Sequence, residues 1–291
     1  MNRADIIRKI ATFPLKSAAL AEDILSGGFR SVFKGNGIEF DEVRRYEPGD
    51  DVRSIDRNVS ARFGTPYIKL YREDHELCVC IIIDCSASMF AGGSARQSRY
   101  EQAVLAAALI AFSAERSGQR LCGLFFDNEP RVVFKPQRGR AHTMAMLSAA
   151  LAARPADSGT SLAAAIKCAN NILKRRSLVV LISDFLSVEW ERDFGALCSK
   201  HDCIAIRIKD PIEENFPSAG LIPIMDAETS ASVLAASNSL SWRLSWQDWH
   251  KERRQLWAAI CKAQGAAEVE ISTDEDTALS LQRFFRSRRF R

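Results

Sequence analysis

Three oxygen-bearing side chains with alternating spacing stand directly after an apolar run and could bind a metal ion. They are Asp84, Ser86 and Ser88, and the run before them reads LCVCIII. A buried strand of a parallel sheet would deliver them to its carboxyl end, where open α/β sheets bind ligands. Hard oxygen ligands of this kind suit Mg²⁺. The alternative interpretation is that Asp84 only caps the following helix or braces a turn.

Such a site needs a sheet to position it, and the chain after residue 76 alternates short β-rich runs with longer amphipathic runs. This pattern predicts a doubly wound, mostly parallel α/β sheet with helices on both faces. Strands are predicted at residues 77–84, 119–127, 131–134, 178–184, 203–208 and 267–272. Helices are predicted at residues 98–117, 141–152, 162–175, 189–200, 244–264 and 275–287.

Two portions of the chain lie outside this alternation, namely residues 1–76 and a stretch within 210–242. The strand-like segments 66–71 and 221–225 each need partner strands. We therefore predict that residues 1–76, with part of 210–242, form a small accessory β-rich module. Residues 77–291 are predicted to form the α/β domain, interrupted by that insertion.

Composition predicts a globular protein of the cytoplasm. The chain has 291 residues, of which 47% are hydrophobic, and this is enough for a substantial core. The net charge of +4 is too small to imply nucleic-acid binding. The eight cysteines lie mostly in apolar runs and favour a reduced compartment, and no nearby His completes a zinc site. We expect no signal peptide and no membrane span.

The motif Asp84-x-Ser86-x-Ser88 after a strand resembles the metal-ion-dependent adhesion site of von Willebrand factor A domains, which have a Rossmann-like fold. The resemblance implies two further ligands from later loops, and Thr160 and Asp184 have the required context. It implies the strand order 3-2-1-4-5-6, with the two Asp residues facing each other. It also implies Mg²⁺, with Mn²⁺ or Ca²⁺ as alternatives, held directly by the hydroxyls and through water by the carboxylates.

A second resemblance lies upstream, in the string GNGIEFDEVRRYEPGDDVRSIDRNVSARFGTPYIKLYRED of residues 35–74. It is similar to the domain of unknown function 58 family, whose members place it before a von Willebrand A domain, and the likeness covers most of the chain. Arg57 departs from the family, which usually has Trp there. The alternating charges could brace a loop or contact a charged partner. The candidate partner-binding residues are Asp50, Asp51, Arg53, Asp56 and Arg62.

These resemblances imply a non-enzymatic adaptor. Similar proteins are associated with MoxR-type AAA+ ATPases in the maturation or remodelling of other proteins. We expect an acidic side chain of such an ATPase, or of its client, to complete the Mg²⁺ shell. One alternative is a metal-dependent hydrolase or phosphatase of the haloacid-dehalogenase type, which needs an Asp where this chain has Ser86. Another is nucleic-acid binding through the basic, Phe-containing residues 283–291.

Four tryptophans lie in or beside the predicted helix 244–264, and Trp242 is the first of them. The other three, Trp246, Trp249 and Trp257, share one helical face, with i, i+3, i+11 spacing. This spacing favours burial in the core, and a groove for a partner is the alternative.

Overall fold

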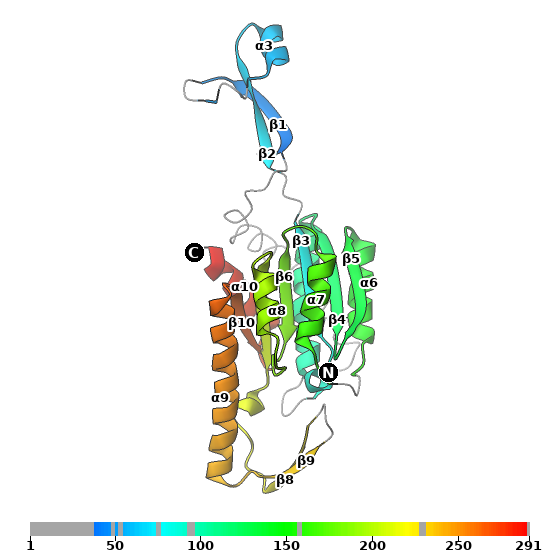
Figure 1. Cartoon of the computed structure of the whole chain (residues 1–291), viewed down its shortest axis with the longest axis vertical. Helices are drawn as coiled ribbons and strands as arrows, with labels where there is room; N and C mark the ends of the chain where they lie inside the picture. Colours follow the sequence, from blue (N-terminus) through cyan, green and yellow to red (C-terminus); the bar gives the residue numbers. More distant parts are fainter. Residues whose placement is uncertain are drawn as a thin grey trace. The chain divides into compact units, whose positions relative to one another are not determined.

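The computed structural model describes residues 38–47, 50–51, 55–73, 77–91, 97–155, 159–226 and 231–289. The chain divides into two compact units, Phe29–Glu76 and a larger unit that contains Leu77–Arg291. Figure 1 shows the elements of each unit. Among the described residues, no helix has both the length and the apolar composition that a bilayer span requires.

The smaller unit is an antiparallel strand pair with one short helix. β1 (Ile38–Arg45) pairs with β2 (Tyr67–Glu73), and α3 (Arg57–Phe63) lies between them in the chain. The Asp56 carboxylate caps α3 by accepting hydrogen bonds from backbone N–H groups of its first turn, and Gly64 ends the helix with φ 69°. An Asp at this cap position stabilises a helix by about 1 kcal/mol, so Asp56 has a structural role here.

The larger unit is built on one six-stranded sheet. Its strands are β3 (Cys78–Asp84), β4 (Arg120–Phe126), β5 (Pro130–Gln137), β6 (Leu178–Ser183), β7 (Asp202–Lys209) and β10 (Ala267–Ser272). Their order across the sheet is β10-β7-β6-β3-β4-β5, and β5 is antiparallel to β4 while the other pairs are parallel. The predicted mostly parallel sheet is therefore confirmed, and numbered along the chain the strands follow the expected order 3-2-1-4-5-6.

Helices cover both faces of this sheet, as predicted (Figure 1). On one face lie α5 (Arg99–Arg116), α6 (Arg140–Ala152) and α10 (Thr277–Arg289). On the other face lie α7 (Leu162–Ile172), α8 (Glu191–Cys198) and α9 (Leu240–Ala263). Two helical layers explain why the central strands are apolar along their whole length rather than at alternate positions.

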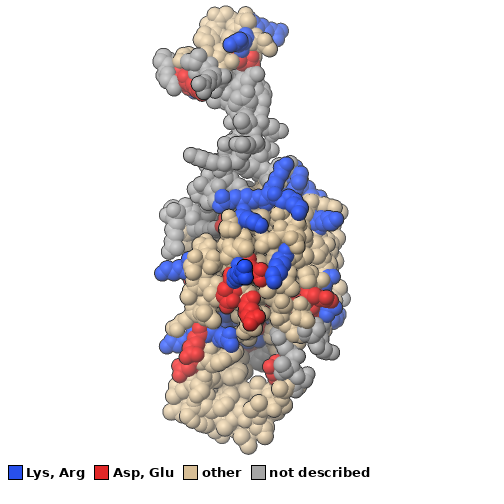
Figure 2. Space-filling model, viewed as in Figure 1, with Lys and Arg blue, Asp and Glu red and all other residues tan. Residues whose placement is uncertain are grey.

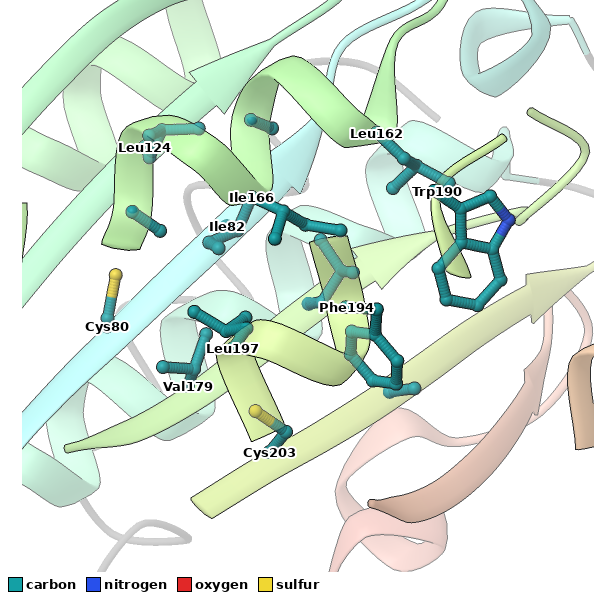
Figure 3. Close-up of a cluster of buried hydrophobic side chains, with 14 of the residues drawn as sticks. Cys80, Ile82, Leu124, Leu162, Ile166, Val179, Trp190, Phe194, Leu197 and Cys203 are labelled. Carbon is teal, nitrogen blue, oxygen red and sulfur yellow. The ribbon is translucent and has the colours of Figure 1, made fainter. Parts of the chain in front are cut away.

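The core beneath α7 and α8 illustrates this packing. All seven residues of β3 are buried, and alternate side chains point to opposite layers. Cys80 and Ile82 of β3 belong to a cluster with Ile166 of α7 and Phe194 of α8 (Figure 3). Because β3 lies between β4 and β6 under helices, its last residue, Asp84, is also carried into a buried position.

The segment between β7 and α9 differs from the prediction. β8 (Leu221–Met225) pairs antiparallel with β9 (Ser232–Ala236), and these two strands form a sheet of their own. They belong to the larger unit, whereas β1 and β2 belong to the smaller one, so the predicted single accessory module is wrong. Each portion found its partner strand nearby in the chain, because closing a short loop costs less conformational entropy than closing a long one.

The start of α9 also differs from the prediction. The helix begins at Leu240 rather than at residue 244, because the Ser239 hydroxyl accepts a hydrogen bond from the Trp242 N–H and caps it there. Trp242 is therefore helical and lies one turn before Trp246, and their rings stack at 5.6 Å between centroids.

Candidate metal centre

The candidate site lies where β3 and β6 end side by side. The strands are parallel neighbours with Ile83 opposite Ile182, so their last residues reach the same edge of the sheet. The chain continues from β3 toward α5 on one face and from β6 toward α8 on the other. A crevice forms outside the strand ends at such a switch point, and open α/β sheets bind ligands there.

Asp84, the last residue of β3, is completely buried. Its Oδ1 accepts a hydrogen bond from the Ser86 N–H at 2.9 Å, and its Oδ2 accepts one from the Ser183 hydroxyl at 2.6 Å. Burial, together with the nearby Asp184 carboxylate, raises the pKa of Asp84 to about 7. Ionising this group in the fold is therefore costly unless a cation compensates its charge.

Asp184 follows β6 directly and is 2% exposed. Its Oδ1 accepts a hydrogen bond from the Leu186 N–H at 3.1 Å, whereas its buried Oδ2 has no hydrogen-bond partner. The next residue, Phe185, has φ 56°, in the left-handed region that non-glycine residues rarely occupy. A strained turn next to an unsatisfied carboxylate oxygen is a feature typical of functional sites.

Ser86 and Ser88 lie on the loop and short helix that follow β3. Ser86 is buried and precedes α4 (Ala87–Phe90), in which Ser88 is half-buried. Their hydroxyl oxygens are 3.1 Å apart. The local sequence thus places both hydroxyls together within four residues of Asp84, as the spacing of the motif predicts.

The backbone of Thr160 is hydrogen-bonded to the loop that follows β6, at the same edge of the sheet. Its carbonyl oxygen accepts a hydrogen bond from the Ser187 hydroxyl at 3.2 Å, which joins its loop to the loop after β6. The next residue, Ser161, donates its N–H to the Asp127 carbonyl at the end of β4 and caps α7 with its side chain. That the Thr160 hydroxyl completes the ligand set stays a prediction.

Arg99, the first residue of α5, is a basic side chain close to this site. Its guanidinium donates to the Ser88 carbonyl at 3.4 Å and to Glu213 at 2.9 Å. The Asp184 carboxylate is among the groups that raise the pKa of Arg99 against the opposing effect of burial. Arg99 therefore holds the backbone of the segment that contains Ser86 and Ser88, and its positive charge offsets part of the negative charge of the site.

Sequence reasoning missed both Ser183 and Arg99. The signal for Ser183 was its polar side chain at the end of the apolar strand 178–182, where a hydroxyl needs a partner. The signal for Arg99 was a basic residue in the first turn of a helix, where the helix dipole disfavours positive charge. Each feature indicates that the side chain needs a polar or charged partner, although neither feature identifies which residue that partner is.

The five candidate partner-binding residues belong to the smaller unit, and two of them, Asp50 and Asp56, hold its loops. Asp50 receives two hydrogen bonds from the Arg44 guanidinium, at 2.9 and 2.7 Å, and one from the Glu47 N–H. Asp56 caps α3. Of the other three, Asp51 and Arg62 are exposed, and Arg53 lies outside the described residues. The contacts of Asp50 and Asp56 match the loop-bracing interpretation of this charged segment.

The cysteines behave as small apolar groups. All eight are free thiols, and burial raises the pKa of Cys78 and of Cys261 to about 12, which keeps them protonated. In the part of the chain that the structure describes, no three His, Cys, Asp or Glu side chains are grouped to hold a metal ion. The predicted set is of a different composition, since it combines two carboxylates with three hydroxyls.

The Phe-containing C-terminal helix is partly accounted for by packing. Phe285 is 1% exposed and Leu281 is fully buried, so one face of α10 lies against the core. Phe284 is half-buried, with its ring 5.0 Å from that of Phe285. Phe285 is therefore occupied by the fold rather than presented as a stacking surface for bases, and Phe290 lies outside the described residues.

Known proteins resemble this chain over most of its length. The family model described as "Protein of unknown function DUF58" matches residues 42–256. Uncharacterized proteins of Mycobacterium tuberculosis and Mycobacterium bovis are each 32% identical over 283 residues, which is 96% of this chain and 89% of the relative.

A solved structure also resembles this chain in part. The crystal structure of the conserved hypothetical protein BatB from Bacteroides thetaiotaomicron matches 73% of this chain and 98% of its own, with 13% identity and a TM-score of 0.48.

Proposed function

Because the chain belongs to the DUF58 family, whose function is unknown, we propose a function from the geometry of its site. We infer that the protein is a non-enzymatic adaptor that presents a bound Mg²⁺ ion to an acidic side chain of a partner protein. The proposal concerns the larger unit, in which the ends of β3 and β6 meet.

The unpartnered Oδ2 of Asp184 is the observation that carries this proposal. It lies buried near Asp84, because Asp84 ends β3, Asp184 directly follows the neighbouring strand β6, and the intervening Ser183 hydroxyl donates to Asp84 at 2.6 Å. Two buried carboxylates repel each other when both are ionised, and burial denies them water. A divalent cation would offset both unfavourable effects, because its positive charge balances the carboxylates and the unpartnered oxygen can coordinate it.

The ligands available at this edge suit Mg²⁺. Ser86, Ser88 and Thr160 would supply neutral hydroxyl oxygens, and Asp84 and Asp184 would supply charge, directly or through water. All are hard oxygen donors, which Mg²⁺ prefers, and Mn²⁺ and Ca²⁺ are the alternative ions. Such an ion would act as a Lewis acid that attracts a carboxylate from another protein.

The likeness to von Willebrand A domains supports an adaptor over an enzyme. Ser86 stands where a phosphatase of the haloacid-dehalogenase type requires an acid/base carboxylate, so that chemistry has no proton donor there. By the same resemblance we propose a MoxR-type AAA+ ATPase, or a client of it, as the partner. Its acidic side chain would meet the ion, and neighbouring loops would contribute specificity.

Calorimetric titration of Mg²⁺ into the full-length chain tests the metal directly. We expect one saturable site, and we expect Ser88→Ala and Thr160→Ala each to weaken binding by about tenfold or more, since each removes an oxygen ligand. Ser199→Ala is the control, because that exposed hydroxyl bonds only locally, to the Ala196 carbonyl. Unchanged Mg²⁺ affinity in both ligand variants would contradict the assigned ligand set.

A pull-down with a purified MoxR-type AAA+ ATPase from the same organism tests the partner. Excess chelator and Asp84→Asn are expected to reduce the captured ATPase to the same extent, because both remove the ion that the partner carboxylate would bind. Circular dichroism of the variant should match that of the unaltered chain. Capture that stays complete in chelator would remove the metal from the interaction.

A further inference from the structure

A groove of 740 Å³ begins beside the candidate metal centre and continues along α9 and β8. Its polar end is formed by Ser88, Arg99 and Ser187. The rest of its lining is mainly apolar, comes chiefly from α9, β8 and residues 212–216, and includes one acidic residue, Asp226. A cavity of this size accommodates several side chains, far more than one metal-bound carboxylate needs.

The aromatic wall of the groove is built by α9. Trp246 donates its indole N–H to the Ile212 carbonyl at 3.0 Å and packs against Phe216, with 5.1 Å between ring centroids. Trp249 lies one turn further and is 44% exposed. Trp257 alone of the three is in the core, so the prediction that the shared face is buried is wrong for Trp249. The Arg253 guanidinium lies over the Trp249 ring, 5.4 Å from its centroid, and the rest of the exposed indole surface is open to a ligand.

The opposite wall is β8, whose composition is equally apolar. Strands β8 and β9 contain no charged residue, and Figure 2 shows the lowest part of the larger unit almost entirely in tan on the face drawn. The side chains of Ile222 and Ile224 are half-buried in the groove wall. An aromatic or aliphatic side chain between β8 and Trp249 would bury apolar surface on both sides.

Pro223 limits how a ligand can bind to β8. The pairs Gly220–Ser237 and Asp226–Ala231 are hydrogen-bonded, so the even-numbered residues of β8 direct their backbone groups toward β9. The backbone of Pro223 therefore faces the other edge, where proline offers no N–H. Strand addition along this edge is interrupted, so a ligand is held mainly by its side chains.

The two ends of the groove favour different kinds of ligand groups. Burial lowers the pKa of His250 to about 4, so its ring is neutral and belongs with the apolar part. At the polar end, Arg99 and the proposed ion attract negative charge. The complementary ligand is therefore acidic at one end and apolar over the remainder.

We propose that the groove binds a short segment of a partner protein in which an Asp or Glu stands next to aromatic or long aliphatic residues. The acidic side chain reaches the metal centre, and the apolar side chains fill the space between Trp249 and β8. This inference rests on the proposed function and extends it. The ion recruits a carboxylate of any kind, and the groove determines which acidic segments bind.

Selection from a library of random short peptides displayed on phage, against the full-length chain in excess MgCl₂, tests this proposal. We expect the enriched peptides to share an acidic residue beside aromatic or aliphatic ones. A synthetic copy of the most enriched peptide should bind about tenfold more weakly to Trp249→Ala and to Ile224→Ser, since buried tryptophan contacts commonly contribute this much. Leu256→Ala, an exposed apolar residue of α9 outside the groove, is the matched control and should bind within about twofold of wild type.

The outcomes separate the groove from the metal. If both groove variants bind as tightly as the unaltered chain while chelator abolishes binding, the groove proposal is overturned and the metal proposal stands. If Trp249→Ala abolishes binding that chelator leaves intact, the acidic end of the proposal is overturned together with the proposed function. Failure to enrich any peptide also overturns it. Self-association that is lost in Trp249→Ala overturns it as well, by assigning the groove to a second copy of the chain.

Discussion

Replacing Glu213 by glutamine is expected to lower the free energy of unfolding by about 3 kcal/mol, because it leaves the buried Arg99 guanidinium without its counter-charge and removes one of the two carboxylates that pair with Arg207. Glu213 ends the short helix η2 (Pro211–Glu213) and is 3% exposed. It receives hydrogen bonds from Arg99 at 2.9 Å and from Arg207 at 2.5 Å. Burial alone would raise the pKa of Glu213, but these two guanidinium groups lower it.

The position of Glu213 explains why the effect should be large. Arg207 on β7 also pairs with Glu270 on β10, and Arg99 on α5 also holds the Ser88 carbonyl. One carboxylate thus connects the sheet, a helix on one face and the loop of the candidate metal centre. Glutamine keeps the shape of glutamate but has one acceptor oxygen where glutamate has two, so the variant removes the charge together with one of the acceptors that Arg99 and Arg207 use.

Urea unfolding of the full-length chain, followed by circular dichroism, measures this change. The matched control is Glu214→Gln, since Glu214 is the next residue, is 56% exposed and pairs with Lys209 at the surface. The control should change stability by less than about 1 kcal/mol, as is usual for a surface ion pair. Similar losses in both variants would show that the burial of Glu213 does not determine its contribution.

Asp84→Asn is expected to stabilise the metal-free protein at pH 8 by about 2 kcal/mol and to abolish its stabilisation by Mg²⁺. Without metal, the fold must hold a buried Asp84 carboxylate beside Asp184, and the amide removes that charge. With saturating Mg²⁺ the order reverses, because only the unaltered chain gains binding energy, about 2.7 kcal/mol at a hundredfold excess over Kd.

The pH dependence of the metal-free protein follows from the raised pKa of Asp84. The ordinary pKa of an aspartate side chain is 3.8 and the pKa of Asp84 in the fold is about 7, so between these pH values the folded state binds more protons than the unfolded state. This contribution to stability is fully present below about pH 4 and is lost as the pH rises to about 7. Asp84→Asn lacks that dependence. In chelator, the free energies of unfolding of the variant and of the unaltered chain should therefore be similar at pH 4 and differ by pH 8.

Thermal unfolding in chelator and in MgCl₂, at pH 4 and pH 8, measures both effects. Asp127→Asn is the control, because Asp127 lies at the end of the neighbouring strand β4 but already pairs with Arg131 at 2.7 Å. It should lose stability and keep its response to Mg²⁺. If Asp84 only braces a turn, Asp84→Asn will instead be destabilised under every condition.

The six strands of the central sheet and the helices that cover it were predictable from the sequence, and so was one part of the candidate site. Apolar runs such as the one before Asp84 predict central strands, because only strands covered on both faces are apolar at every position. The spacing of Asp84, Ser86 and Ser88 then places three oxygens near one strand end, since these residues are neighbours in the chain. The local sequence pattern was enough to predict these features, because burial sets the spacing of apolar residues and because the motif residues are close together in the chain.

The surroundings of that motif depend on how the strands and helices pack. Arg99 and Glu213 are 114 positions apart, and Ser183 lies 99 positions from Asp84, so no local pattern relates the members of either pair. Helical periodicity also could not predict the exposure of Trp249. The periodicity shows that Trp246, Trp249 and Trp257 share one face of the helix, but it does not show where along the helix that face stops contacting the core. α9 extends past the sheet to β8, and so its first turns form a groove while its later turns are buried. Side chains distant in sequence meet only when strands and helices pack, and that packing is fixed by the sum of many contacts rather than by any one segment.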